Sequence, residues 1–198
     1  MILIMTNGAM WFMWFRVLWI FVAQGWQKLS DNDDDICENT LRRSVLRATG
    51  ISFLELLNSI IGLTRSNPLQ VLLFFAVRFG TEQWVTPLIG CGAWQHLFTV
   101  ACWSVGEFVR FGCFALDRVY PGIRTLKSLR YTVGPLLFPL GALGEMLMVI
   151  RAASDTGRPI LYGAAALWPV GFYPLMKQLL KQRRKHFAEA KKPQIKSV

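Results

Sequence analysis

The chain has 198 residues, of which 53% are hydrophobic and 13% aromatic, and it carries a formal charge of +10. Several separate apolar runs are about 18 to 22 residues long, the length that crosses ~30 Å of hydrocarbon, which argues against a single soluble domain. Most Lys and Arg residues lie in the tail and between these runs rather than on one amphipathic face. The composition therefore indicates a membrane protein with basic ends and argues against nucleic-acid binding.

Six apolar segments predict an all-α fold, a polytopic membrane bundle of about six transmembrane helices. They cover about residues 8–26, 50–64, 68–89, 93–116, 131–150 and 159–180. The first has no basic start and no clear small-residue cleavage site, so we expect a retained span rather than a signal peptide. Between the second and third lies TRSNP, where Asn67 and Pro68 favour a tight turn. This pair of segments is expected to form a helical hairpin.

The predicted organisation is one membrane domain over residues 1–187, with an acidic loop over 27–49, followed by a basic tail over 188–198. An even number of spans places both termini on the same side of the membrane. By this arrangement that side holds 13 of the 22 Lys and Arg residues, the opposite side holds six, and three lie within apolar runs. The positive-inside rule then makes both termini cytosolic and places the DNDDD stretch at 31–35 on the far side.

Ionisable residues within the apolar runs need a structural or functional reason, because each costs ~2.5 to 3.5 kcal/mol at the bilayer centre. Arg78 and Glu82 are four residues apart, and Glu107 and Arg110 are three apart, so each pair is expected to meet on its own helix. Glu55 has no cation at either spacing. We expect it to pair across helices, with Arg78 or Arg110, or to cap a short helix near the surface.

Glu145 is the most isolated of these acids, with Gly141, Ala142, Met148 and Val149 at the neighbouring helical positions. Burial away from water disfavours the charged form of a carboxyl, which suits a group that takes and returns protons near neutral pH. The residue is therefore a candidate general acid/base. A structural hydrogen bond to another helix is the alternative. The small residues beside it, Gly144 included, either open space or mark a close helix contact.

The cysteines give no sign of a metal site. They are Cys37, Cys91, Cys102 and Cys113, and they show neither CxxC nor Cys/His spacing, while the two histidines, His96 and His186, are far apart in the chain. We therefore expect no metal. Cys102 and Cys113 are eleven residues apart and share a helix face, so they are expected to be small apolar packing residues.

The run LRYTVGPLLFPLGALGEMLMVIRAA (129–153) resembles the signature of the endoplasmic-reticulum 3-hydroxyacyl-CoA dehydratases, once called protein-tyrosine-phosphatase-like proteins. Three further stretches resemble motifs of that family in the same order. They are FLELLNSIIGL (53–63), WSVGEFVRF (103–111) and YPLMKQLLKQRRKHF (173–187). Together they cover most of residues 50–187. Residues 1–49 match poorly, although Gly25-Trp26 is similar to a Gly-Trp pair in the family's first span.

The resemblance implies a six-span protein of the endoplasmic-reticulum membrane with both termini cytosolic. It implies dehydration of long and very-long-chain (3R)-3-hydroxyacyl-CoA to trans-2-enoyl-CoA, the third step of fatty-acid elongation. Acyl-CoA would be the substrate, no cofactor would be needed, and the partners would be membrane lipid and other elongation enzymes. The family's catalytic tyrosine and glutamate fall on Phe138 and Glu145, so the phenolic hydroxyl is missing here. The alternative is a catalytically impaired homologue that acts as a scaffold or binding subunit of the elongation complex.

Supporting roles are also expected from the resemblance. Tyr131 matches the family's Arg-Tyr pair, a position-setting role near the cytosolic surface, and Glu107 and Arg110 would order the bundle or the thioester end. Glu145 lies fifteen residues beyond Arg130, ~20 Å along a helix, so the CoA head would stay near the 117–130 loop. The expected CoA contacts are Arg118, Arg124, Lys127 and Arg130. Candidates to replace the hydroxyl are Tyr173, Tyr162, Thr132, Ser104 and ordered water.

Two other functions use some of the same residues. A tyrosine phosphatase needs a Cys-x5-Arg phosphate cradle, but only four residues separate Cys113 from Arg118, so this activity is excluded. A small transporter or proton channel would use the same intramembrane acids. The sequence shows no internal repeat that favours it.

Overall fold

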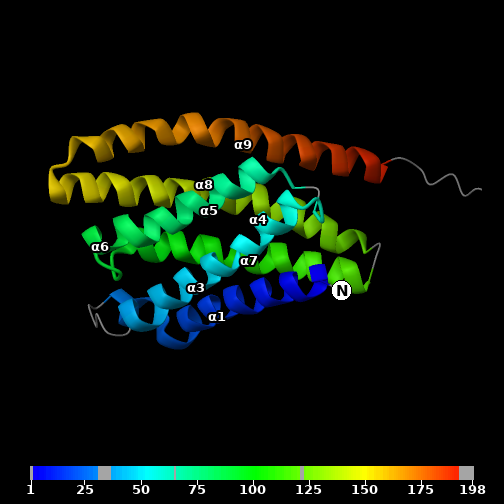
Figure 1. Cartoon of the computed structure of the whole chain (residues 1–198), viewed down its shortest axis with the longest axis horizontal. Coiled ribbons are helices and arrows are strands. Elements are labelled where there is room, and N and C mark those ends of the chain that lie inside the picture. The colour runs from blue at the N-terminus through cyan, green and yellow to red at the C-terminus, as the bar shows by residue number, and fades with distance from the viewer. Residues whose placement is uncertain (1, 31–36, 65, 121–122, 192–198) are drawn as a thin grey trace, which may run out of the picture.

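The computed structural model of the chain describes residues 2–30, 37–64, 66–120 and 123–191, and within these ranges it contains helices and no strand. The helices form six rods, which confirms the predicted all-α class (Figure 1). The rods are α1 (Ile2–Ser30); η1 (Cys37–Arg42) with α3 (Arg43–Ile51) and α4 (Phe53–Ile60); α5 (Pro68–Gly80) with η2 (Thr81–Val85) and α6 (Thr86–Ile89); α7 (Trp94–Val119); α8 (Arg124–Thr156); and α9 (Pro159–Lys191).

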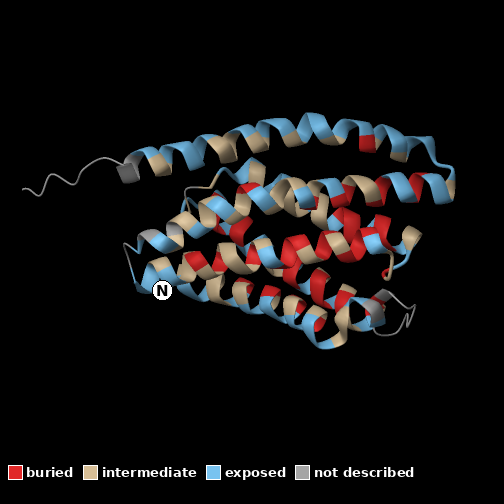
Figure 2. Ribbon diagram, turned by 180° about the vertical axis from the view of Figure 1, so that it is seen from behind, coloured by how far each residue is buried: buried red, intermediate tan, exposed pale blue. Residues whose placement is uncertain are grey.

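α7 is the central helix of the bundle. It packs against α1 on one side and α8 on the other, while α9 packs along α8 at the outer edge (Figure 1). Figure 2 shows that buried positions gather on α7 and its neighbours, whereas α9 is largely exposed. Three of the described helices, in α1, α7 and α8, are long and apolar enough to cross a membrane. Their outward apolar side chains would then face lipid rather than water.

The second rod is longer than the sequence predicted. Its helical residues begin at Cys37, so the loop expected over 27–49 is wrong from that residue onward. Leu41, Val45 and Ala48 repeat at helical spacing and are fully buried. Because Arg42, Arg43 and Arg47 lie between them, the stretch has low mean hydropathy and hides its helix. The acidic residues at 31–35 lie outside the described part of the chain.

The hairpin between the second and third rods is confirmed. Asn67 precedes α5 as its N-cap, and its side chain accepts a hydrogen bond from the Leu69 amide at 3.0 Å. Pro68 takes the first helical position, where its missing N–H costs nothing. The other rods also extend past their predicted bounds, and α9 continues through Lys191 into the segment predicted as a basic tail. Residues 192–198 lie outside the described ranges.

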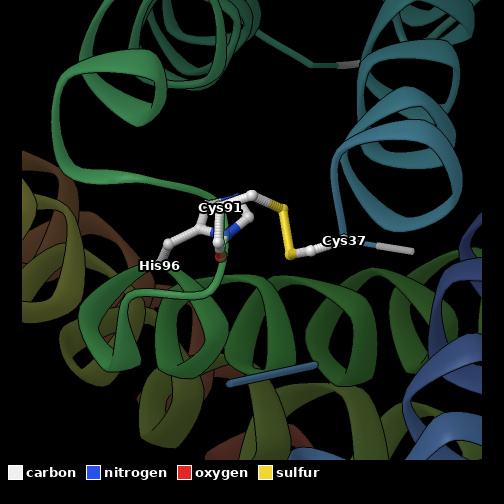
Figure 3. A group of neighbouring side chains, drawn as sticks. All are labelled: Cys37, Cys91 and His96. Carbon is white, nitrogen blue, oxygen red and sulfur yellow. Dashed lines mark hydrogen bonds between the residues drawn. A yellow bond between two sulfur atoms is a disulfide. The ribbon is translucent and has the colours of Figure 1, made fainter. Parts of the chain in front are cut away.

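The two ends of the bundle differ in their chain segments. One end, called here the tail end, holds the start of α1, the α4–α5 turn, the start of α8 and the end of α9 (Figure 1). The opposite end holds η1, α6 and the α8–α9 turn. There a disulfide joins Cys37 in η1 to Cys91 before α7, so we call it the disulfide end (Figure 3). Both ends of the described chain thus lie at the tail end, as an even number of spans requires.

A buried polar cluster lies beside the disulfide. The His96 ring contacts the Cys91 carbonyl oxygen at 2.6 Å through Nδ1 and Glu82 Oε1 at 3.1 Å through Nε2. Arg42 donates to the Glu82 backbone carbonyl at 3.0 Å, which ties η1 to η2. The ligand atoms of Cys37, Cys91 and His96 are close enough together to hold one metal ion, but the two sulfurs are bonded to each other. The cluster therefore fastens three rods together at this end.

Removing the disulfide should destabilise the bundle. With Cys91→Ser, the free energy of unfolding should fall by about 2–4 kcal/mol, because the cross-link constrains the unfolded chain. A thermal or denaturant titration in detergent measures this loss. Cys113→Ser is the matched control, because Cys113 is buried and carries a free thiol. Maleimide-polyethylene glycol labelling of the denatured wild type should mark two cysteines without reductant and four with it; four without reductant would contradict the pairing.

Candidate active site

A cavity of about 1090 Å³ runs through the bundle between α1, α4, α5, α7, α8 and α9. On α8 its lining extends from Arg130 at the tail end to Glu145, a distance of ~20 Å along the helix. Phe138 lies between these residues and also lines the cavity. Apolar side chains form most of the wall, and polar and charged side chains lie at several levels along it. A long space of this kind suits an extended apolar molecule with one polar head.

Glu145 is buried at the deep end of the cavity, with an exposed fraction of 8%. Its Oε1 accepts a hydrogen bond from the indole Nε1 of Trp103 at 2.9 Å, and the Trp168 indole on α9 is close enough to interact with the same carboxyl. No described Lys, Arg or His forms an ion pair with it. The hydrogen bond to another helix, which was the alternative interpretation, is thus present, and the general acid/base role of Glu145 stays a prediction.

The small residues near Glu145 act in both of the ways considered from the sequence. Gly141 and Ala142 line the cavity. Gly144 lies against α7, where a Cβ would overlap the side chain of Thr99. α8 can thus approach α7 closely at one turn and leave open space at the next.

A chain of partly buried ion pairs lies next to Glu145. Arg110 donates to Glu107 at 2.7 Å on its own helix and to Glu55 at 2.7 and 3.1 Å on α4. Glu107 also pairs with Arg78 of α5. The predicted Glu107–Arg110 pair and the predicted contact of Glu55 across helices are confirmed. Two acids and two bases neutralise one another across three rods.

The predicted Arg78–Glu82 pair is wrong. A residue four positions along shares a face only when the helix keeps 3.6 residues per turn, and Thr81–Val85 form a wider π-helical turn. Glu82 is instead turned towards His96 and is fully buried. Arg78 pairs with Glu107 instead, and its guanidinium carbon lies 5.4 Å from the centroid of the Trp103 ring. Sequence patterns gave no signal for the π turn.

Phe138 lies in an aromatic stack that crosses three helices. Its ring stacks on Phe172 of α9 with centroids 5.1 Å apart and meets Phe74 of α5 edge-on at 5.5 Å. A hydrogen bond between the Gln70 and Gln178 side chains joins the same two helices nearer the tail end. Phe138 therefore packs as part of the cavity wall, where α5, α8 and α9 meet.

The other hydroxyls proposed from the sequence do not reach this site. Thr132 donates to the Ser128 carbonyl and Ser104 to the Ala101 carbonyl on their own helices. Tyr162 contacts Ser154, and Tyr173 is 67% exposed. None of these four lines the cavity. The polar groups closest to the Glu145 carboxyl are the two indoles, which the sequence interpretation had not considered, although Trp103 opens the motif WSVGEFVRF.

The tail end of the cavity is lined by cations and amides. Arg118 and Arg130 line it together with Gln178 and Gln182, while Tyr131 stacks on His186 at 4.7 Å. Arg130 lies over the Phe114 ring at 4.1 Å. Two of the four residues that were expected to contact CoA, Arg118 and Arg130, thus line the cavity. The side chains of Arg124 and Lys127 lie outside the described part of the structure.

Comparison with known proteins gives consistent matches. Residues 49–189 match the family described as "Protein tyrosine phosphatase-like protein, PTPLA". The chain is 28% identical over 159 residues to a probable very-long-chain (3R)-3-hydroxyacyl-CoA dehydratase of Schizosaccharomyces pombe, and this match covers 74% of each protein. It is 27% identical over 172 residues to the very-long-chain (3R)-3-hydroxyacyl-CoA dehydratase 3 of Mus musculus, covering 72% of this chain and 45% of the mouse protein. No solved structure gives a significant match.

The ion-pair chain should matter more to stability than an exposed pair. Glu107→Gln should lower the free energy of unfolding by up to about 3–5 kcal/mol, because it leaves the half-buried Arg78 guanidinium without its partner. Asp155→Asn is the control, since it breaks the exposed Arg151–Asp155 pair and should cost less than about 1 kcal/mol. Denaturant titration in detergent compares the two. Equal losses would show that the buried pairs do not hold the rods together.

Proposed function

The chain belongs to the protein tyrosine phosphatase-like family, and we propose that it dehydrates long-chain and very-long-chain (3R)-3-hydroxyacyl-CoA to the trans-2-enoyl-CoA. The observation that carries this proposal is the buried Glu145 carboxyl, without an ion pair, at the deep end of a long cavity. An acyl chain fits the apolar wall, and the polar head fits the cations at the tail end. Both named relatives bear the same dehydratase name.

In the proposed mechanism the Glu145 carboxylate removes a proton from C2 of the substrate. The thioester carbonyl makes this proton acidic by taking the electron pair as an enolate. The pair then returns to form the C2–C3 double bond as the C3–O bond breaks. The hydroxyl leaves as water after it takes the proton back from Glu145. One carboxyl thus serves as base and then as acid, so no cofactor is required by the proposal.

Nearby groups have supporting roles in this proposal. Arg78 lines the cavity close to Glu145, and its positive field would stabilise the developing enolate charge. Glu107 and Arg110 fix the position of Arg78 through the ion-pair chain. Tyr131 would set the position of the tail end, where it stacks on His186. Phe138 contributes an aromatic wall for the acyl chain rather than a hydroxyl.

The proposed location is the endoplasmic-reticulum membrane with both termini cytosolic. A disulfide persists in an oxidising compartment, which supports placing the disulfide end in the lumen. The tail end carries the basic end of α9, which supports placing it in the cytosol. CoA would then enter from the cytosolic side, with Arg118 and Arg130 binding its phosphates. Arg124 and Lys127 stay in this proposal from the sequence alone.

The reaction also suggests partners. The substrate is the product of a 3-ketoacyl-CoA reduction, and the product is ready for reduction of its double bond. We therefore propose that the chain works beside the other enzymes of fatty-acid elongation, in contact with membrane lipid.

Replacing the acid should abolish the activity. In purified full-length protein, Glu145→Gln should lower kcat for a long-chain (3R)-3-hydroxyacyl-CoA by about 10²- to 10⁴-fold, the usual value of a general acid/base. Asp155→Asn, an exposed acid on the same helix, should leave kcat unchanged. Enoyl-CoA formation is followed chromatographically. A wild type without product, with activity appearing in Phe138→Tyr, would contradict the proposal and favour a scaffold role.

Removing the cations at the tail end should weaken substrate binding. The double change Arg118→Gln and Arg130→Gln should raise KM for the CoA substrate by about tenfold while kcat changes little, because phosphate contacts lie far from the reacting carbons. Arg158→Gln removes an exposed cation at the disulfide end and serves as the control. Steady-state kinetics at low and high salt measure both effects. An unchanged KM would rule out these two arginines as CoA ligands.

A further inference from the structure

Trp103 is held in one orientation beside Glu145. Its indole is 4% exposed, and its Nε1 donates to Glu145 Oε1 at 2.9 Å. The Arg78 guanidinium lies over the ring at 5.4 Å. The ring also packs against α8 at Gly141, where a Cβ would come within 3.4 Å of Cδ1. These contacts leave the donor little freedom to turn away from the carboxyl.

We propose that Trp103 is a positioning residue of the dehydration, which holds Oε1 of Glu145 so that Oε2 exchanges the proton with the substrate. The inference rests on the proposed function. An indole N–H is a donor only, so Trp103 neither supplies nor accepts the proton. It keeps the same bond while the carboxyl acts first as base and then as acid. In this chain an indole therefore orients the carboxyl at a site where Phe138 offers no hydroxyl.

A second tryptophan provides a matched control. Trp14 of α1 is fully buried and lies under the same Arg78 guanidinium at 5.9 Å. Its Nε1 has no hydrogen-bond partner among the described residues, and it is not part of the cavity lining. Trp→Phe at either position removes similar buried ring surface next to the same cation. Trp103→Phe alone removes a hydrogen bond to Glu145.

The test compares kcat and KM of the purified full-length variants on a long-chain (3R)-3-hydroxyacyl-CoA. Trp103→Phe should lower kcat by about 10- to 100-fold, the range expected for one lost hydrogen bond to a charged group, with KM within about twofold of wild type. Trp14→Phe should keep kcat within about twofold. Trp103→Gln keeps an N–H donor of similar reach that does not titrate, and should recover part of the lost kcat.

Three results would overturn the inference while the proposed function stands. The first is a kcat of Trp103→Phe within twofold of wild type. The second is an equal loss of kcat in Trp14→Phe. The third is a kcat of Trp103→Gln no higher than that of Trp103→Phe when both variants are obtained in the same folded yield. The Glu145→Gln variant distinguishes failure of this inference from failure of the proposal on which it rests. If it is inactive and Trp103→Phe is fully active, only the inference fails. If Glu145→Gln is fully active, the proposed acid/base role of Glu145 fails and the inference fails with it, whereas a wild type that forms no product would contradict the proposed function itself.

Discussion

Charge neutralisation in an apolar interior is the constraint on which the bundle depends. A buried acid or base is costly unless a partner of opposite sign lies within reach, and here the partners come from different rods. Glu107 of α7 pairs with Arg78 of α5, and Arg110 of α7 pairs with Glu55 of α4. Neither pairing forms until these rods are packed. The central position of α7 therefore follows from its charges as well as from its apolar faces.

The same pairing leaves Glu145 as the remaining acid of the cavity. Glu55 and Glu107 are paired with Arg78 and Arg110, whereas the Glu145 carboxyl makes no ion pair with the described side chains. An intramembrane acid without a partner is expensive to keep, which favours a functional reason for it. Arg78 links the two systems, because it pairs with Glu107 and also lies over the ring of Trp103. The ion-pair chain thus fixes the indole that binds the Glu145 carboxyl.

Much of this arrangement follows from the sequence, and the exceptions have physical reasons. The apolar runs predicted the rods, and the spacing of Glu107 and Arg110 predicted their contact, because both features depend on local chain geometry. The π turn at Thr81–Val85 changes the helical register, so the spacing of Arg78 and Glu82 was misleading. Arginines between Leu41 and Ala48 concealed an amphipathic helix. The pairing of Cys37 with Cys91 depends on tertiary structure and cannot be read from cysteine spacing.

The indole beside Glu145 also suits the chemistry that a single carboxyl must perform. The carboxyl has to gain and lose one proton in each turnover. An arginine at bonding distance would hold it as an ion pair, and a second titrating side chain would compete for the proton. An indole N–H orients one oxygen and does neither. Phe138 can therefore serve the aromatic wall with Phe74 and Phe172, while the polar partner of the carboxyl comes from α7.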